Sequence, residues 1–169
     1  MGAVWEGRDP AASLRDNICR YWVSRLEALS AAPADPDRPP TAPDVVARSP
    51  LTAPDKLMGI AVAVLDTAER KKPEVGYERC VLALDVEFQA RLALGDEGSA
   101  ACNRLLLEVQ LLFGSDLHSG NMALNLVEVG NEIDVDGPAD RVVGGVVHFE
   151  VTYRHAVRDP RRLPGEQPT

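Results

Sequence analysis

Three histidines are the first candidates for chemistry in this chain, because an imidazole can act as a general acid or base near neutral pH. His118 falls in a polar stretch, whereas His148 and His155 fall in one strand-like segment. The latter two are an odd number of positions apart, so on a regular strand they point to opposite faces and do not form one site. The chain also lacks GxSxG, HExxH and Gly-Lys-Thr phosphate-loop motifs. The residues therefore predict no enzyme active site.

The acidic stretch from Asn131 to Gly137 is the candidate for metal binding. Its acids alternate with apolar residues, as in part of a calcium loop. However, twelve residues counted from Asn131 end at Val142, where the calcium-loop frame requires a glutamate. The alternation is better explained by the edge of a hairpin. We therefore expect neither a metal nor a cofactor.

The cysteines Cys19, Cys80 and Cys102 do not resemble a disulfide framework or a metal site. Their number is odd, no CxxC spacing occurs, and each falls on or beside a predicted apolar face. We expect buried, reduced thiols.

Composition narrows the class of protein. The chain has 169 residues, of which 45% are hydrophobic, and this suits a single domain with an aliphatic core. The net charge of -8 leaves no basic patch for holding nucleic acid. No apolar run approaches the roughly 20 residues of a membrane span, and no signal-peptide pattern opens the chain.

The segment from Asp140 to Pro160 carries the clearest structural pattern. From Val147 onward, apolar residues at odd positions mostly alternate with polar residues at even positions. This predicts a long antiparallel strand with one face on the core and one face in water. The Gly144-Gly145 pair predicts a bend or bulge. The polar face supplies four candidate interaction residues: His148, Glu150, Thr152 and Arg154.

Helical and strand patterns alternate through the rest of the chain. Periodicity predicts two helices and three further strands, over 9–30 and 96–113, and over 57–66, 77–94 and 122–129. A turn-rich connection over 71–76 makes the first two of these strands a hairpin. The sequence therefore predicts an α+β fold, an antiparallel sheet of about four strands with two helices packed on one face.

A proline-rich stretch interrupts this pattern over 31–54. Seven prolines in 24 residues exclude a helix or a central strand and predict an extended arm, with a disordered linker as the alternative. Val45, Val46 and Leu51 are apolar residues in this arm and are candidates for docking on another subunit. The predicted organisation is a single domain over 1–169, with a sheet–helix core over 55–160 and a flexible tail over 161–169.

The element order and the closing phrase from Val142 to Pro160 (VVGGVVHFEVTYRHAVRDP) resemble the tail-terminator, or tail-completion, proteins of long-tailed bacteriophages. The resemblance covers Asp9 to Pro160 and consists of pattern and order, without a catalytic signature. The chain departs from the family's usual length chiefly through the arm over 31–54.

The resemblance implies a structural role in the virion. Such proteins form a hexameric ring that caps the tail tube in the neck region, ends its polymerisation and offers a surface to the head–tail connector. The implied partners are copies of the chain itself, the tail-tube protein and the connector, with DNA only passing through the lumen. Assembly in the cytoplasm of the bacterial host is implied, with no membrane and no cofactor.

Three physical features agree with that role. An acidic lumen would let DNA pass without sticking, a long strand with a polar outer face could extend sheets between subunits, and a proline-rich arm could lie across a neighbour at low entropic cost. Two alternatives stay open. One is a neck, head-completion or tail-tube protein of the same virion; the other is a small cytoplasmic α+β enzyme or binding protein.

Overall fold

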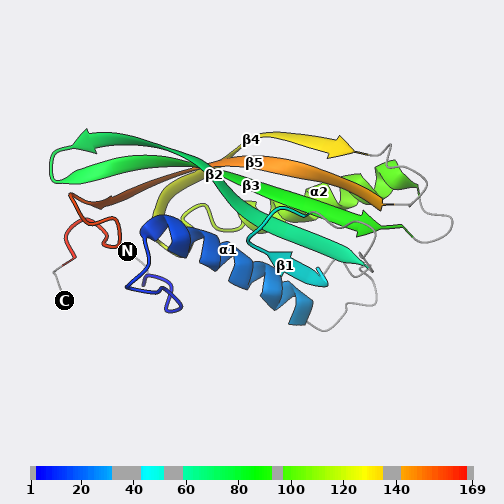
Figure 1. Ribbon diagram of the computed structural model, residues 1–169, viewed down its shortest axis with the longest axis horizontal. Helices are drawn as coiled ribbons and strands as arrows, with labels where there is room; N and C mark the ends of the chain where they lie inside the picture. Colours follow the sequence, from blue (N-terminus) through cyan, green and yellow to red (C-terminus); the bar gives the residue numbers. More distant parts are fainter. Residues whose placement is uncertain (1–2, 32–42, 52–58, 93–96, 135–141, 167–169) are drawn as a thin grey trace.

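A computed structural model of the chain describes residues 3–31, 43–51, 59–92, 97–134 and 142–166 (Figure 1). These residues form an α+β fold with two helices and a five-stranded sheet. The strands are β1 Val45–Ala47, β2 Ile60–Glu74, β3 Tyr77–Arg91, β4 Ala123–Asp134 and β5 Val142–Ala156. The helices are α1 Leu14–Ala31 and α2 Gly98–Gly114.

The sheet corrects the predicted architecture of about four antiparallel strands. Its order is β1-β2-β3-β5-β4. The additional strand, β1, pairs in parallel with β2, placing Val45 beside Ala61 and Ala47 beside Ala63. The sheet is therefore mixed. The sequence analysis missed β1 because a three-residue edge strand between prolines carries no periodicity of its own.

The helix α1 begins at Leu14, later than the predicted start at Asp9. The side chain of Asn17 is fully buried and fastens the preceding turn: its Oδ1 accepts the Asp9 backbone N–H at 2.7 Å, and its Nδ2 donates to the carbonyl oxygens of Asp9 and Ser13. Asp9 therefore closes a turn in front of the helix and does not cap it. The sequence pattern alone does not separate these two arrangements.

The hairpin of β2 and β3 is longer than predicted and forms one end of the molecule, where β5 runs beside β3 as far as Tyr77 (Figure 1). Residues 71–74, expected to belong to a turn, continue β2 and pair with Cys80 through Tyr77 of β3. The turn itself is Val75–Gly76, and the φ of +84° at Gly76 favours glycine. Pro73 is accommodated because β2 is bordered there by no other strand among the described residues.

Both helices pack on one face of the sheet, as predicted. Trp22 of α1 stacks on Phe113 of α2 with ring centroids 4.1 Å apart, and Phe113 stacks on Phe149 of β5 at 4.8 Å. All three rings are almost completely buried. The predicted apolar side of β5 is buried at Val147, Phe149, Val151 and Tyr153. This column of rings joins the two helices to the last strand.

The glycine pair of β5 does not form the expected bend or bulge. β5 pairs with β3 without interruption from Val142 to Ala156, and the irregularities lie in β2 and β4 instead. A Cβ on Gly145 would lie 2.5 Å from the carbonyl oxygen of Glu132 and 2.8 Å from the ring of Phe88. The glycines therefore allow close approach of neighbouring strands.

The two chain segments next to the termini lie together at the end of the molecule that bears the hairpin (Figure 1). Arg8 pairs with Glu166 at 2.6 Å, and Leu14 donates its backbone N–H to the carbonyl oxygen of Pro160 at 2.8 Å. Residues 161–166 of the expected tail are thus held against the N-terminal segment, whereas 167–169 lie outside the described residues.

Candidate subunit-interaction surfaces

The histidines occupy separate places, as the spacing predicts. On the face of β5 away from the helices, His148 Nδ1 lies 2.7 Å from Asp85 Oδ1 of β3. His155 is buried on the opposite face, with Nε2 3.2 Å from Glu78 Oε2. His118 lies in the loop before β4, outside both strands. The three imidazole rings therefore do not come together in one catalytic site.

The four candidate residues of β5 lie on one face, and three of them, His148, Glu150 and Arg154, already have side-chain partners within the chain. Glu150 accepts a hydrogen bond of 2.7 Å from Arg70, and the guanidinium of Arg154 lies 4.4 Å from the centre of the Tyr77 ring. Thr152 and His148 are half-buried in the same row. These residues present a polar surface on which a neighbour could rest, and their role in subunit contact stays a prediction.

The backbone of β5 is not available for extending the sheet into another subunit. β5 lies between β3 and β4 and pairs with both along most of its length. The expected sheet extension through the last strand is therefore wrong. Any extension must use an outer strand, and the long outer strand on that side is β4.

The candidate residues of the arm are placed against the chain's own sheet. Val45 and Val46 belong to β1, and Val45 is half-exposed. Leu51 donates its backbone N–H to Glu87 at 3.1 Å, and its carbonyl accepts a hydrogen bond from Gln89 at 3.4 Å. The segment after β1 thus reaches the sheet face opposite the helices. The remainder of the predicted arm, 32–42 and 52–58, lies outside the described residues.

A cluster of charges holds β1 against α1 and β2. Arg48 donates to the carbonyl of Val64 at 3.1 Å and pairs with Asp66 at 3.0 Å. Arg15 of α1 pairs with the same carboxylate at 2.5 Å. Partial burial opposes ionisation of Asp66, but the hydrogen bond from Arg15 and the charge of Arg48 outweigh it and hold its pKa below the ordinary value. The cluster is structural.

The edge strand β4 is a surface that the sequence analysis did not select. Its side chains Leu124, Val127, Val129 and Ile133 are 40–58% exposed. Within the described part of the chain, β4 pairs only with β5, so its other edge carries unpaired backbone groups. An exposed apolar edge strand favours association with another chain. The alternation of apolar and polar residues was visible in the sequence, but the position at the edge was not.

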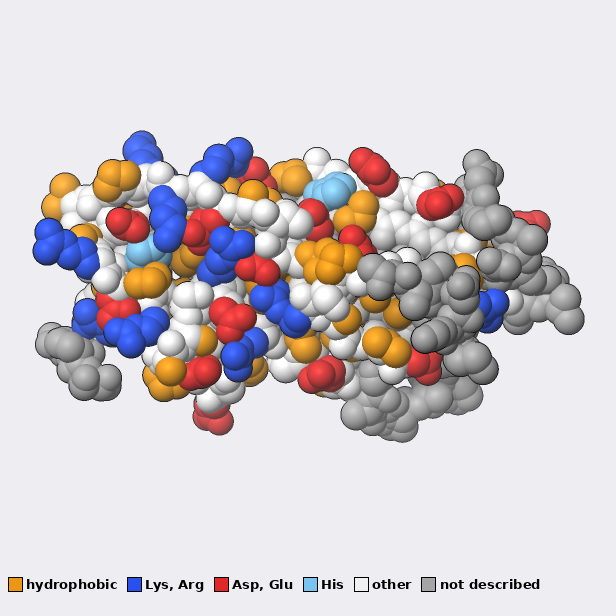
Figure 2. Space-filling view, viewed as in Figure 1, with side chains coloured by type: hydrophobic (Ala, Val, Ile, Leu, Met, Phe, Trp, Pro, Cys, Tyr) orange, Lys and Arg blue, Asp and Glu red, His pale blue; other side chains and the backbone are white. Residues whose placement is uncertain are grey.

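Charge is distributed unevenly over this acidic protein. Figure 2 shows Lys and Arg side chains gathering over the end that holds the β2–β3 hairpin and the chain termini. On the hairpin, Arg70, Lys71 and Lys72 are exposed. In contrast, β4 contains Glu128, Glu132 and Asp134 and no lysine or arginine. The most exposed charged side chains of β2 are therefore basic, whereas those of β4 are acidic.

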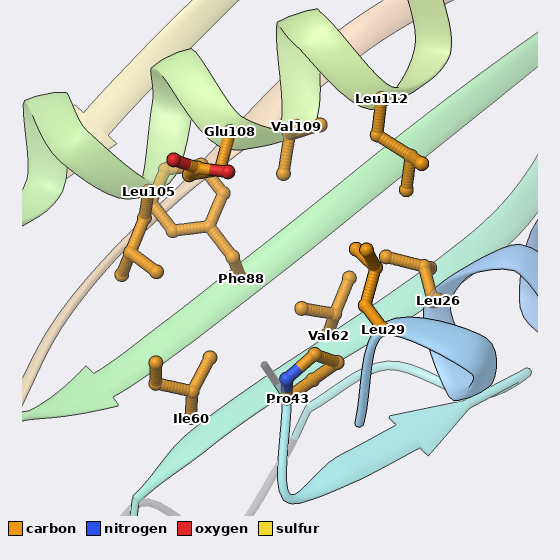
Figure 3. A pocket seen from close by; sticks show the side chains of 10 residues that line it. All are labelled: Leu26, Leu29, Pro43, Ile60, Val62, Phe88, Leu105, Glu108, Val109 and Leu112. Atoms are coloured by element: carbon orange, nitrogen blue, oxygen red, sulfur yellow. The ribbon is translucent and has the colours of Figure 1, made fainter. Parts of the chain in front are cut away.

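The cavity between the helices is too small for a substrate. It lies where the end of α1 and one side of α2 meet β2 and β3, and apolar side chains surround it together with Glu108 (Figure 3). Its volume of about 20 Å³ has room for about one water molecule, whereas ligand pockets typically measure about 300–1,000 Å³.

A larger, open groove lies between the start of β4 and the C-terminal segment. It measures about 850 Å³ and is mainly apolar. Three of its four polar side chains, all but His118, are engaged within the chain: Arg154 stacks on Tyr77, Glu166 pairs with Arg8, and Asn121 donates to a backbone carbonyl. The groove therefore lacks polar groups converging on a ligand.

The described residues contain no group of three or more His, Cys, Asp and Glu side chains that could hold a metal ion. The three cysteines are buried and unpaired in disulfides, as predicted. Burial raises the pKa of the Cys19 thiol to about 12, so it is a poor nucleophile at neutral pH.

Comparison with known proteins does not supply a family, so the functional proposal depends on the surfaces described above. None of the helices in the part of the chain that the structure describes is both long and apolar enough to cross a membrane. No protein-family model matches the chain, and no curated protein matches it.

Proposed function

We propose that this protein is a structural subunit of a bacteriophage virion, a tail terminator. In this role a hexameric ring caps the tail tube, ends its polymerisation and forms the tail side of the head–tail joint. The partners are further copies of the chain, the tail-tube protein and the connector. The protein acts in the virion without catalysis or cofactor, and DNA only passes through the ring.

The observation that carries the proposal is the sheet with both helices on one face. Its opposite face bears the polar row of β5, and β4 presents an apolar edge with no strand beyond it among the described residues. The helices cover the core on one face of the sheet. The opposite face and the β4 edge are therefore the surfaces on which neighbouring subunits can bind.

Two further observations support a structural role over a catalytic one. The cavity between the helices holds about one water, and three of the four polar side chains around the open groove, all but His118, are engaged within the chain. The net charge of -8 also suits a ring through which DNA passes, because like charges repel.

The test is the solution mass of the full chain together with electron microscopy. Light scattering should give about 110 kDa, six times 18.3 kDa, and images should show closed rings. When added to tail tubes that lack a terminator, the protein should stop further growth. Long self-assembled tubes would instead identify a tail-tube subunit. A monomer that leaves tube ends free to grow would contradict the proposal and favour the enzyme or binder alternative.

A further inference from the structure

The sheet has two long unpaired edges that run in opposite directions. On one side, β1 covers β2 only at residues 61–63, so β2 from Thr67 to Glu74 has no further strand beside it within the described ranges. On the other side, β4 has no strand on its outer edge among the residues that the structure describes. Because β2, β3, β5 and β4 are successively antiparallel, β4 runs antiparallel to β2. Copies placed side by side in one orientation therefore present antiparallel edges to each other.

Two charged residues of each edge lie on the same face of the sheet. Arg70 and Lys72 are paired across β3 with Val81 and Arg79, which alternate with the buried residues of that strand. Glu132 and Asp134 are paired with Val146 and Gly144 of β5, on the face away from Val143 and Val147. Both sets therefore lie on the face opposite the helices. The two exposed cations are two residues apart, and so are the two exposed anions; Arg70 also pairs with Glu150 of its own chain at 2.7 Å.

We propose that the hairpin edge of β2 in one copy binds the β4 edge of the next copy, with Lys72 opposite Glu132 and Arg70 opposite Asp134. This contact rests on the proposed function, because it specifies how the subunits join in the ring. In an antiparallel register the same alignment brings Val75, which is 98% exposed at the hairpin tip, to the level of the exposed Val129. Opposite charges and apolar pairs directly across a strand pair stabilise it.

The charges also determine the symmetry of the contact. Two β4 edges paired with each other would bring carboxylates together, and two β2 edges would bring cations together. Like charges opposed across strands are destabilising. The contact is therefore heterologous, joining one edge to the different edge of a neighbour, and contacts of this type close into rings or continue as filaments. A twofold dimer is disfavoured.

Charge reversal tests the contact directly. Lys72→Glu and Glu132→Lys should each raise the concentration needed for half-maximal assembly by about tenfold, because attraction becomes repulsion. In an equimolar mixture, opposite charges return at every contact where the two variants alternate, and the double variant Lys72→Glu/Glu132→Lys restores them within one chain. Both should therefore assemble at concentrations close to that of the wild type. Glu27→Lys makes the same charge change as Glu132→Lys, but on the exposed side of α1. It is the matched control and should leave assembly unchanged.

Cysteine cross-linking tests the register. Lys72→Cys and Glu132→Cys should form a disulfide-linked pair when mixed and oxidised, because the native cysteines are completely buried and do not compete. Lys72→Cys mixed with Glu27→Cys should not cross-link. If Glu132→Lys assembles as the wild type does and the first pair fails to cross-link, the edge contact is wrong while a ring joined by other surfaces stands. A wild-type protein that neither forms rings nor stops tube growth contradicts the proposed function itself.

Discussion

Replacing Phe113 by alanine should lower the free energy of unfolding by about 4 kcal/mol. The side chain is completely buried between Trp22 of α1 and Phe149 of β5, at centroid distances of 4.1 and 4.8 Å. Truncation of a buried phenylalanine to alanine typically costs about 3–5 kcal/mol, which includes the cavity left behind. A value above the lower end of this range applies because contacts with two stacked rings are lost and because α1, α2 and β5 hold the cavity open.

The assay is equilibrium urea unfolding, followed by tryptophan fluorescence and circular dichroism at a protein concentration where wild type and variant are both unassembled. Since domains of this size are stable by about 5–15 kcal/mol, the variant should stay folded with a much lower midpoint. Phe113→Leu is the matched control: it retains most of the buried volume but loses the stacking, and should cost about 1–2 kcal/mol. A loss below about 1 kcal/mol for the alanine variant, or equal losses for both variants, would refute the view that this ring joins the two helices to the sheet.

Two further changes test local features of the fold. Asp66→Asn should lower the free energy of unfolding by about 1.5 kcal/mol at neutral pH, because it weakens the pair with Arg15. The folded-state pKa of Asp66 lies below 3.8, so this stabilisation is present above about pH 4 and is lost as the pH falls further. In urea unfolding, wild type and variant should therefore converge near pH 2. Gly145→Ala should lower the free energy of unfolding by about 2 kcal/mol, since its Cβ would meet the Glu132 carbonyl at 2.5 Å. The control Gly130→Ala, whose Cβ would have no atom within 4 Å, should change the urea midpoint little. Equal effects of the two changes would contradict the close approach of β4 and β5.

Local periodicity predicted the elements with a buried side. The alternation of β5 correctly selected Val147, Phe149, Val151 and Tyr153 as its core face. The apolar stripe predicted for the second helix consisted of Cys102, Leu105, Leu106, Val109, Leu112 and Phe113. In α2 all of these are buried except Leu106 and Leu112, which are half-buried. These predictions hold because side chains return to the same side every two residues in a strand and every 3.6 residues in a helix. Burial of one side therefore produces a periodic apolar pattern within a short stretch of sequence.

The outer parts of the sheet show no such periodic apolar pattern in the sequence. The second half of β2 reads as a charged turn, yet β3 pairs with it through Tyr77 and extends it to Glu74. The strand β1 is recognised only by its pairing with Ala61–Ala63. Here the partner strand supplies the backbone hydrogen bonds. The lysines and the proline of β2 are typical of the edge of a sheet, so this part of the sequence lacks the apolar alternation of a buried strand.

The candidate surface shows the same division. The sequence alone determined which residues of β5 share its polar face, because alternate side chains point to opposite sides of a strand. Only the tertiary structure placed β5 between two partners, Val45 and Val46 on the chain's own sheet, and the apolar side chains of β4 at an edge. Strand order depends on contacts between segments far apart in the chain, and no local pattern specifies which strand is outermost. The surfaces open to another subunit were therefore decided by packing.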